Sequence, residues 1–73
     1  MILIKTFIGE AYNFKDAIIN ATDLVQAFLE KNNNITLLFI NSHDRYETCS
    51  ISCYTAFHSI TITYTLSDNN KDH

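Results

Sequence analysis

The stretch from Asn13 to Lys31, NFKDAIINATDLVQAFLEK, decides how this chain folds. Its apolar residues recur at steps of three and four positions, which places them along one stripe of an α-helix over residues 14–31. Asn13 suits the N-cap, and Asp16 in the first turn suits the positive end of the helix dipole. The stripe consists of Phe14, Ala17, Ile18, Ala21, Leu24, Val25, Phe28 and Leu29.

Two features of this helix lie outside the stripe. Ile19 falls on the polar side, so we expect it to be exposed or to lie in an interface. Three consecutive asparagines, residues 32–34, follow the helix. Because asparagine tolerates the left-handed backbone conformation of a C-cap, we expect them to end it.

The remaining apolar segments indicate β-strands. Residues 2–8 and 35–40 are rich in β-branched residues and apolar on both faces, which favours a parallel pair joined by a right-handed crossover through the helix. Residues 49–53 and 60–66 alternate between apolar and polar side chains, but in opposite phase. We therefore expect an irregularity between Tyr54 and His58.

Together these segments predict an α+β fold. We expect a single β-α-β-β domain over residues 1–66, with room for one further strand. Its sheet would be mixed, with three or four strands, and one amphipathic helix would pack on one face. The polar residues 67–73 are expected to form a disordered tail.

Composition excludes several classes of function. The chain has 73 residues, 47% hydrophobic and 18% charged, with a net charge of −3. Five scattered basic residues make no phosphate-binding stripe, so we expect no nucleic-acid partner. No apolar run approaches the ~18 residues of a membrane-spanning helix, so we expect no membrane partner. Two cysteines and an N-terminus that reads as a strand, not as a signal peptide, predict a cytoplasmic location.

The apolar character of both faces of the first two strands predicts self-association. One helix can cover only one face of the sheet, which leaves a contiguous apolar patch on the other face. We therefore expect a homodimer or a higher homo-oligomer, formed by sheet packing or by pairing of edge strands. The alternative is that the last strands fold back over the exposed face.

The segment from Asn41 to Thr48 is predicted to be a polar loop. It contains His43, Arg45 and Tyr46, which could contact a partner protein or a small anion. A solvated hairpin loop is the alternative interpretation. With Ile19, these three residues are the candidate binding residues.

The cysteines and histidines do not form a recognisable metal motif. His43, Cys49, Cys53 and His58 are poorly spaced for zinc. On one continuous strand, Cys49 and Cys53 would lie ~13 Å apart, too far to share a metal or a disulfide. We therefore interpret both as small buried residues and expect no metal.

No motif in the sequence indicates a catalytic site or a cofactor. Gly9 is the only glycine, so there is no glycine-rich phosphate loop. A thiol nucleophile paired with His58 would lack an orienting third group at a recognisable spacing. We expect no cofactor and no enzymatic activity.

Four segments give the chain a resemblance to a family of small Bacillus sporulation proteins that has phage relatives. They are Ile4-Lys5-Thr6-Phe7 with Glu10, Ala27-Phe28-Leu29-Glu30, Ile35-Thr36-Leu37-Leu38 and Ser59-Ile60-Thr61-Ile62-Thr63-Tyr64. The resemblance covers most of the chain but not the region of residues 43–58 or the cysteines. It implies a strand–helix–strand plan and a small accessory protein, with no known catalytic activity and no metal.

Three functional hypotheses follow. The first is a non-enzymatic, oligomeric accessory or inhibitor factor of a low-GC bacterium or its phage, for example an anti-defence protein. The absence of proline, the single glycine and the abundance of Ile, Asn and Thr fit such a genome. The second is an oligomeric sponge for a nucleotide or other small anion, held by Lys5, His43, Arg45 and Tyr64. The third is a structural component of a larger assembly.

Overall fold

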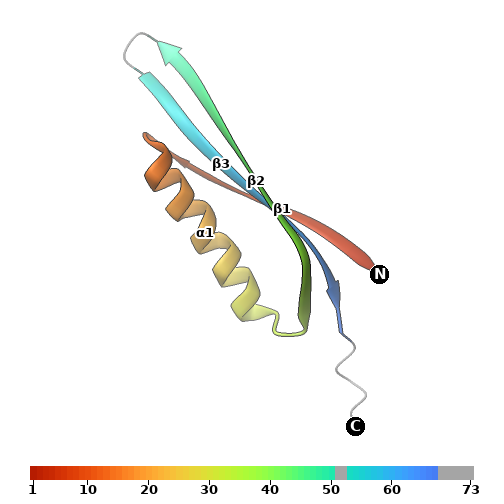
Figure 1. The fold of residues 1–73 in the computed structure, drawn as a ribbon. Coiled ribbons are helices and arrows are strands. Elements are labelled where there is room, and N and C mark those ends of the chain that lie inside the picture. Colours follow the sequence, from red (N-terminus) through yellow and green to blue (C-terminus); the bar gives the residue numbers. More distant parts are fainter. Residues whose placement is uncertain (51–52, 68–73) are drawn as a thin grey trace.

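The chain folds as one helix packed on a three-stranded sheet (Figure 1). The computed structural model describes residues 1–50 and 53–67, with the side chains of residues 49 and 50 left out. The elements are β1 (Ile2–Ala11), α1 (Phe14–Lys31), β2 (Ile35–Ser50) and β3 (Cys53–Leu66). The predicted α+β class and β-α-β-β order are confirmed. The predicted disordered tail comprises residues 67–73. Ser67 is held by its amide, which donates to the Asn34 carbonyl at 2.8 Å, and residues 68–73 lie outside the described residues.

The sheet has the strand order β1-β3-β2, and both strand pairs are antiparallel. The expectation of a mixed sheet with β1 and β2 as a parallel pair is therefore wrong. β2 and β3 are joined by a short hairpin connection, which pairs them locally. The other side of β3 then accepts β1, so the strand nearest the C-terminus is the central one.

Both long strands differ from their predicted bounds. β2 continues through residues 41–48, which were predicted to form a polar loop. β3 runs without interruption through Tyr54 and His58, where an irregularity was expected. The shifts in register lie in β2, between Leu37 and Phe39 and between Thr48 and Ser50.

The ends of α1 are held by asparagine side chains. At the N-terminus the Asp16 amide donates to Asn13 Oδ1 at 2.8 Å, which confirms the predicted cap. At the C-terminus the Asn32 side chain donates to the Phe28 carbonyl at 2.8 Å. The predicted left-handed C-cap is wrong, because Asn32 has φ −127° and no described non-glycine residue has a positive φ.

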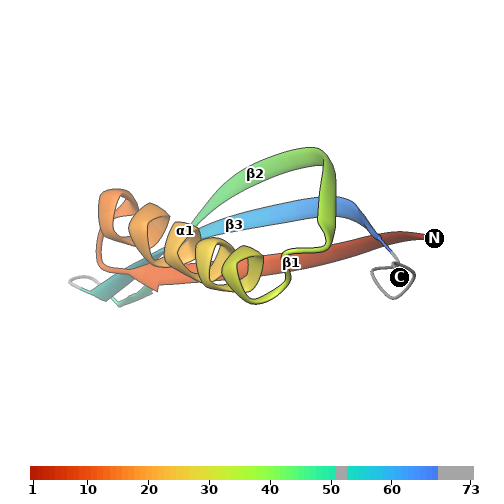
Figure 2. The ribbon, with the colours of Figure 1, turned by 90° about the horizontal axis from the view of Figure 1, so that it is seen from below.

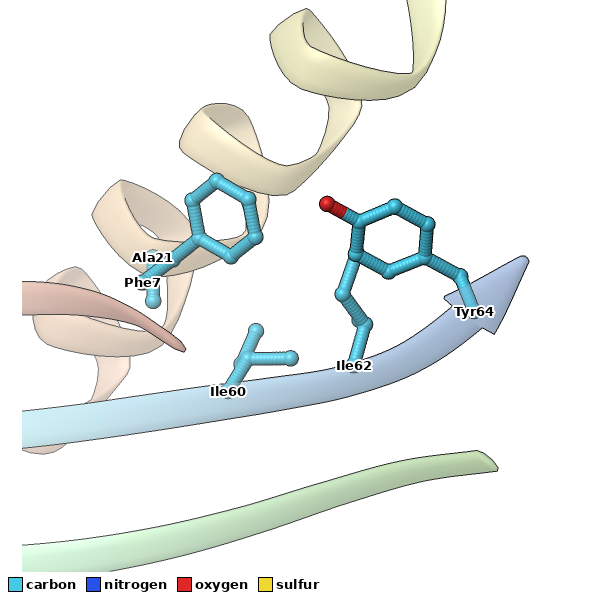
Figure 3. Packing of buried hydrophobic residues seen from close by; sticks show 5 residues of the cluster. All are labelled: Phe7, Ala21, Ile60, Ile62 and Tyr64. Atoms are coloured by element: carbon cyan, nitrogen blue, oxygen red, sulfur yellow. The ribbon is translucent and has the colours of Figure 1, made fainter. Parts of the chain in front are cut away.

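The core lies between α1 and the strands β1 and β3. Figure 3 shows Ile60, Ile62 and Tyr64 rising from β3 toward the helix. Phe7 joins them from β1, and Phe28 bridges the rings of Phe7 and Tyr64 at centroid distances of 5.4 and 5.7 Å. Burial of these apolar groups is the main stabilising term of the fold.

The core is thin because the most buried residues of the helix stripe have small side chains. Ala17 and Ala21 are fully buried, whereas Ile18 and Leu24 on the flanks of the stripe are exposed. α1 lies over β1 and β3, and β2 lies beside it (Figure 2). The helix therefore leaves most of β2 uncovered, although Ile35 packs against the core and Tyr46 contacts Phe14 of the helix.

Gly9 is the point of closest approach between sheet and helix. A Cβ atom built on Gly9 would lie 2.2 Å from the Ala17 carbonyl oxygen and 2.4 Å from the Ala21 amide nitrogen. Its backbone φ is not positive, so the requirement for glycine is one of space. Any larger residue at this position would push the helix off the sheet.

We predict that Gly9→Ala destabilises the fold by at least the ~1–3 kcal/mol typical of overpacking, since its new neighbours are backbone atoms. Urea unfolding measures this as a lower midpoint at an unchanged slope. Glu10→Ala, at the exposed neighbouring position, is the control and should change stability by less than ~0.5 kcal/mol. A Gly9→Ala variant as stable as the wild type would contradict the close approach.

Candidate functional site

The sheet has two distinct faces. The helix face carries Phe7, Ile60, Ile62 and Tyr64 beneath α1. The open face, on the other side, carries the threonine row of β3 and the isoleucines of β1. Directly opposed residues of antiparallel strands project to the same face of a sheet. The register therefore assigns each residue of β2 to one of the two faces, except at the two register shifts.

The predicted binding residues do not come together. His43 and Arg45 oppose Ser59 and Phe57, so they lie on the open face. Tyr46 opposes the buried Ala56 and lies on the helix face. Ile19 is exposed, as predicted, and lies on the side of the helix turned away from the sheet. The four residues therefore belong to three separate surfaces.

Arg45 is fixed on the open face by two neighbours. Its guanidinium lies 4.7 Å from the centroid of the Phe57 ring, and its Nε lies 3.3 Å from Glu47 Oε2. Both members of the ion pair are more than half exposed, so the pair adds little to stability. Its main effect is to neutralise this part of the open face.

Tyr46 belongs to a group of stacked rings, here called the aromatic end, which consists of Phe14, Tyr46 and Tyr54. The Tyr46 ring centroid lies 5.6 Å from Phe14 and 5.3 Å from Tyr54. Partial desolvation raises the pKa of the Tyr46 hydroxyl above its usual value, and the nearby Tyr54 raises it further. Tyr46 is therefore a neutral phenol at physiological pH, able to donate and accept hydrogen bonds.

Sequence reasoning missed the pairing of His58 with Asp44. His58 is 8% exposed on the helix face, and its Nδ1 lies 2.5 Å from Asp44 Oδ1. The signal was present in the sequence, because His58 shares the phase of Ile60 and Ile62, which point inward. The pair satisfies a buried polar group and links β2 to β3.

We predict that Asp44→Ala costs about 1–3 kcal/mol, because it leaves a buried nitrogen of His58 without a partner. In the double variant with His58→Leu most of this loss should disappear, and chemical denaturation of all four proteins gives the coupling. His43→Ala, on the open face of the same strand, is the control. Purely additive effects of the two substitutions would show that the pair does not stabilise the fold.

An open depression lies at the N-terminal end of α1, beside the end of β1. It is lined by Glu10, Ala11, Tyr12, Asp16, Asn20, Cys53 and Thr55. Several of its polar groups already serve the fold. Asp16 Oδ2 accepts from Asn13 in the helix cap at 3.2 Å, and Asn20 donates to the Glu10 carbonyl at 3.0 Å. With two carboxylates in its wall, the depression does not suit an anion.

The cysteines differ from their predicted role. Cys49 lies in β2 and Cys53 in β3, on either side of the hairpin connection, so the separation expected for one continuous strand does not apply. Cys53 is exposed and disulfide-bonded, so it is not a small buried thiol. The cysteines therefore no longer support the prediction of a reducing compartment.

The proposed metal and anion residues are also dispersed. His43 lies on the open face and His58 on the helix face. Within residues 1–50 and 53–67, no group of three or more His, Cys, Asp or Glu is placed to hold a metal ion. Of the residues expected to bind an anion, Lys5 and Tyr64 lie on the helix face, with Lys5 Nζ 5.4 Å from the Phe28 ring, whereas Arg45 is on the open face.

Comparisons with known proteins add no assignment. No family model matches the chain, and no curated protein or solved structure matches it. The resemblance to small sporulation proteins therefore stays a prediction. In the part of the chain that the structure describes, no helix has the length and apolar character needed to cross a membrane.

Proposed function

We propose that this chain is a non-enzymatic interaction protein that works as a homodimer or higher homo-oligomer. Its finer role would be that of an accessory or inhibitor factor of a low-GC bacterium or its phage, such as an anti-defence protein. The observation that supports the proposal is a run of four consecutive apolar side chains left in water, Leu37, Leu38, Phe39 and Ile40. Contiguous surfaces of this kind mark interaction sites.

The dimensions of the chain support the same proposal. Its radius of gyration is 15.5 Å, whereas a compact domain of this length would have about 11 Å. α1 is ~27 Å long at 1.5 Å per residue, and β2 and β3 are ~45–55 Å long at ~3.3 Å per residue. The strands extend well beyond the helix (Figure 1), so one copy cannot bury their apolar residues.

We predict that native mass spectrometry of gently purified protein will give a dimer or a larger assembly. Light scattering after gel filtration, over a range of concentrations, provides an independent mass. A monomer at every concentration would contradict the oligomeric part of the proposal. Additional mass matching a nucleotide would favour the anion-sponge alternative, and open-ended growth with concentration would favour the structural-component alternative.

The aromatic end is the surface that we propose for a protein partner. Tyr46 and Tyr54 are both more than 40% exposed, and Tyr46 packs against Phe14, the first residue of α1. Tyrosines that present a large ring and a free hydroxyl are enriched among residues that dominate binding energy. His43 and Arg45 lie on the opposite face of the same strand.

We predict that Tyr46→Ala weakens partner binding by at least ~10-fold, as expected for a central aromatic contact worth more than ~1.4 kcal/mol. A partner recovered from source cells would be identified, purified and titrated against each variant. Ile19→Ala tests the candidate residue on the far side of the helix, and Leu24→Ala, at an exposed helix position that is not a candidate, is the control that should retain wild-type affinity. Loss of binding in the Ile19 variant alone would move the partner site to the helix.

A cytoplasmic location is also part of this proposal and has its own test. Thiol labelling before and after reduction, in protein purified with thiols blocked at lysis, reports whether Cys53 is oxidised in the cell. A reduced Cys53 fits a cytoplasm kept reducing by thiols. A quantitatively oxidised Cys53, the state seen in the structure, would favour an oxidising compartment and would contradict a cytoplasmic location.

A further inference from the structure

We propose that the disulfide bond of Cys53 closes the β2–β3 hairpin through Cys49 and is a redox switch for the aromatic end. In the oxidised state the bond holds the two strands together at this end of the hairpin. In the reduced state the strands separate there while the core stays folded. The inference rests on the partner surface proposed above, but its first tests need no partner.

The strand register supports Cys49 as the partner of Cys53. Cys53 is disulfide-bonded, and Cys49 is the only other cysteine in the sequence. Cys49 precedes Ser50, which opposes Cys53 across the hairpin. Its other neighbour, Thr48, opposes Tyr54. Opposed Cα atoms in an antiparallel pair lie ~4.5–5.5 Å apart, and disulfides join Cα atoms ~4.4–6.8 Å apart, so a bond within one chain is geometrically accessible.

The sheet is narrowest at this end of the hairpin. β1 ends at Ala11, which opposes Ala56, so the next residues of β3 have β2 as their one neighbour among the described strands. We call this part, residues 47–50 and 53–55, the two-stranded tip. None of its described side chains is buried. Because an isolated two-stranded ribbon is marginally stable in water, the tip depends on a covalent link more than the core does.

The bond is coupled to the aromatic end through neighbouring residues. Tyr54 follows Cys53 directly, and its ring centroid lies 5.3 Å from that of Tyr46. Tyr46 lies 5.6 Å from Phe14 of α1, which fixes it at the base of the tip. Separation of the tip strands would therefore move Tyr54 away from the other two rings. Reduction would break up the surface proposed for the partner.

Cys53 is accessible to a reductant. It is exposed and lines the open depression beside the start of α1. Exposed disulfides are the readily reduced and regulatory ones, whereas structural disulfides resist the glutathione pool. In a reducing cytoplasm, disulfides are usually transient or redox-sensing. An accessible bond at the narrowest part of the sheet fits a switch better than a permanent staple.

The reductant that we propose is a cellular dithiol. One of its thiolates attacks a sulfur atom of the bond and forms a mixed disulfide, which releases the other cysteine as a thiol. The second thiol of the reductant then displaces the remaining cysteine. In balance, two electrons and two protons pass to the protein, which gains two thiols, and the dithiol becomes a disulfide.

Hydrogen exchange on the oxidised and reduced protein tests the switch. We expect reduction with dithiothreitol to speed amide exchange in the two-stranded tip by at least ~10-fold, while residues 58–64 of β3 keep their protection. The double variant Cys49→Ser with Cys53→Ser is the control, and it should exchange like the reduced wild type with or without dithiothreitol. Equal exchange in both states of the wild type would refute the switch. Loss of protection throughout the chain would make the bond a staple of the whole fold.

Two further measurements can overturn parts of the proposal. Intact mass of the unreduced protein should equal one chain lacking two hydrogens, and a disulfide-linked dimer would refute the bond to Cys49 within one chain. A glutathione buffer at a cytosolic ratio of thiol to disulfide should reduce about half of the molecules or more. A bond that stays intact in this buffer would be structural and would refute the switch.

Partner binding separates the switch from the proposed function. The purified partner should bind the reduced wild type at least ~10-fold more weakly than the oxidised form, because the rings of the aromatic end no longer stack. Equal affinity in both states would refute the coupling of the bond to the aromatic end. Wild-type affinity of Tyr46→Ala would instead refute the proposed partner surface, so the two failures are distinguishable.

Discussion

The close approach of Gly9 to the backbone of α1 is the constraint on which the rest of the structure depends. With no side chain at Gly9 and only methyl groups at Ala17 and Ala21, the helix descends onto β1 and the adjoining β3. A helix ~10 Å wide covers about two strands spaced ~4.8 Å apart. The third strand must therefore lie outside its cover. The exposure of β2 is thus a consequence of the same contact that stabilises the core.

Sequence patterns predicted the helix and the fold class because both depend on local periodicity. The bounds of α1 and its Asn13 cap follow from the apolar stripe and one side-chain hydrogen bond. Strand order does not follow from local periodicity. Apolar residues on both faces suggested that residues 35–40 pair in parallel with residues 2–8, whereas β2 is an edge strand that pairs antiparallel with β3. Nothing local distinguishes burial inside one chain from burial against a partner.

The candidate site was predictable only in its parts. Residues 41–48 were predicted to form a loop because they are polar. A strand whose two faces are both exposed to solvent tolerates polar side chains, however, and β2 includes these residues. Once that segment is extended, neighbouring residues alternate in direction, so Arg45 and Tyr46 separate onto opposite faces. To predict the contact of Asp44 with His58 one needs the register of the β2–β3 hairpin. That register depends on where β2 ends and β3 begins, and the apolar–polar alternation placed this point wrongly.

The distribution of polar groups gives the uncovered surfaces different characters. Lys5 blocks pairing at the edge of β1, and the hydroxyl row of β3 keeps the centre of the open face hydrated. Arg45 and Glu47 neutralise each other at the far end of β2. Exposed apolar side chains nevertheless remain at both edges of the sheet, at Ile2 and Ile4 on β1 and at residues 37–40 on β2. One helix cannot cover both of these edges, and that is the physical reason why the proposed function needs a partner or a second copy.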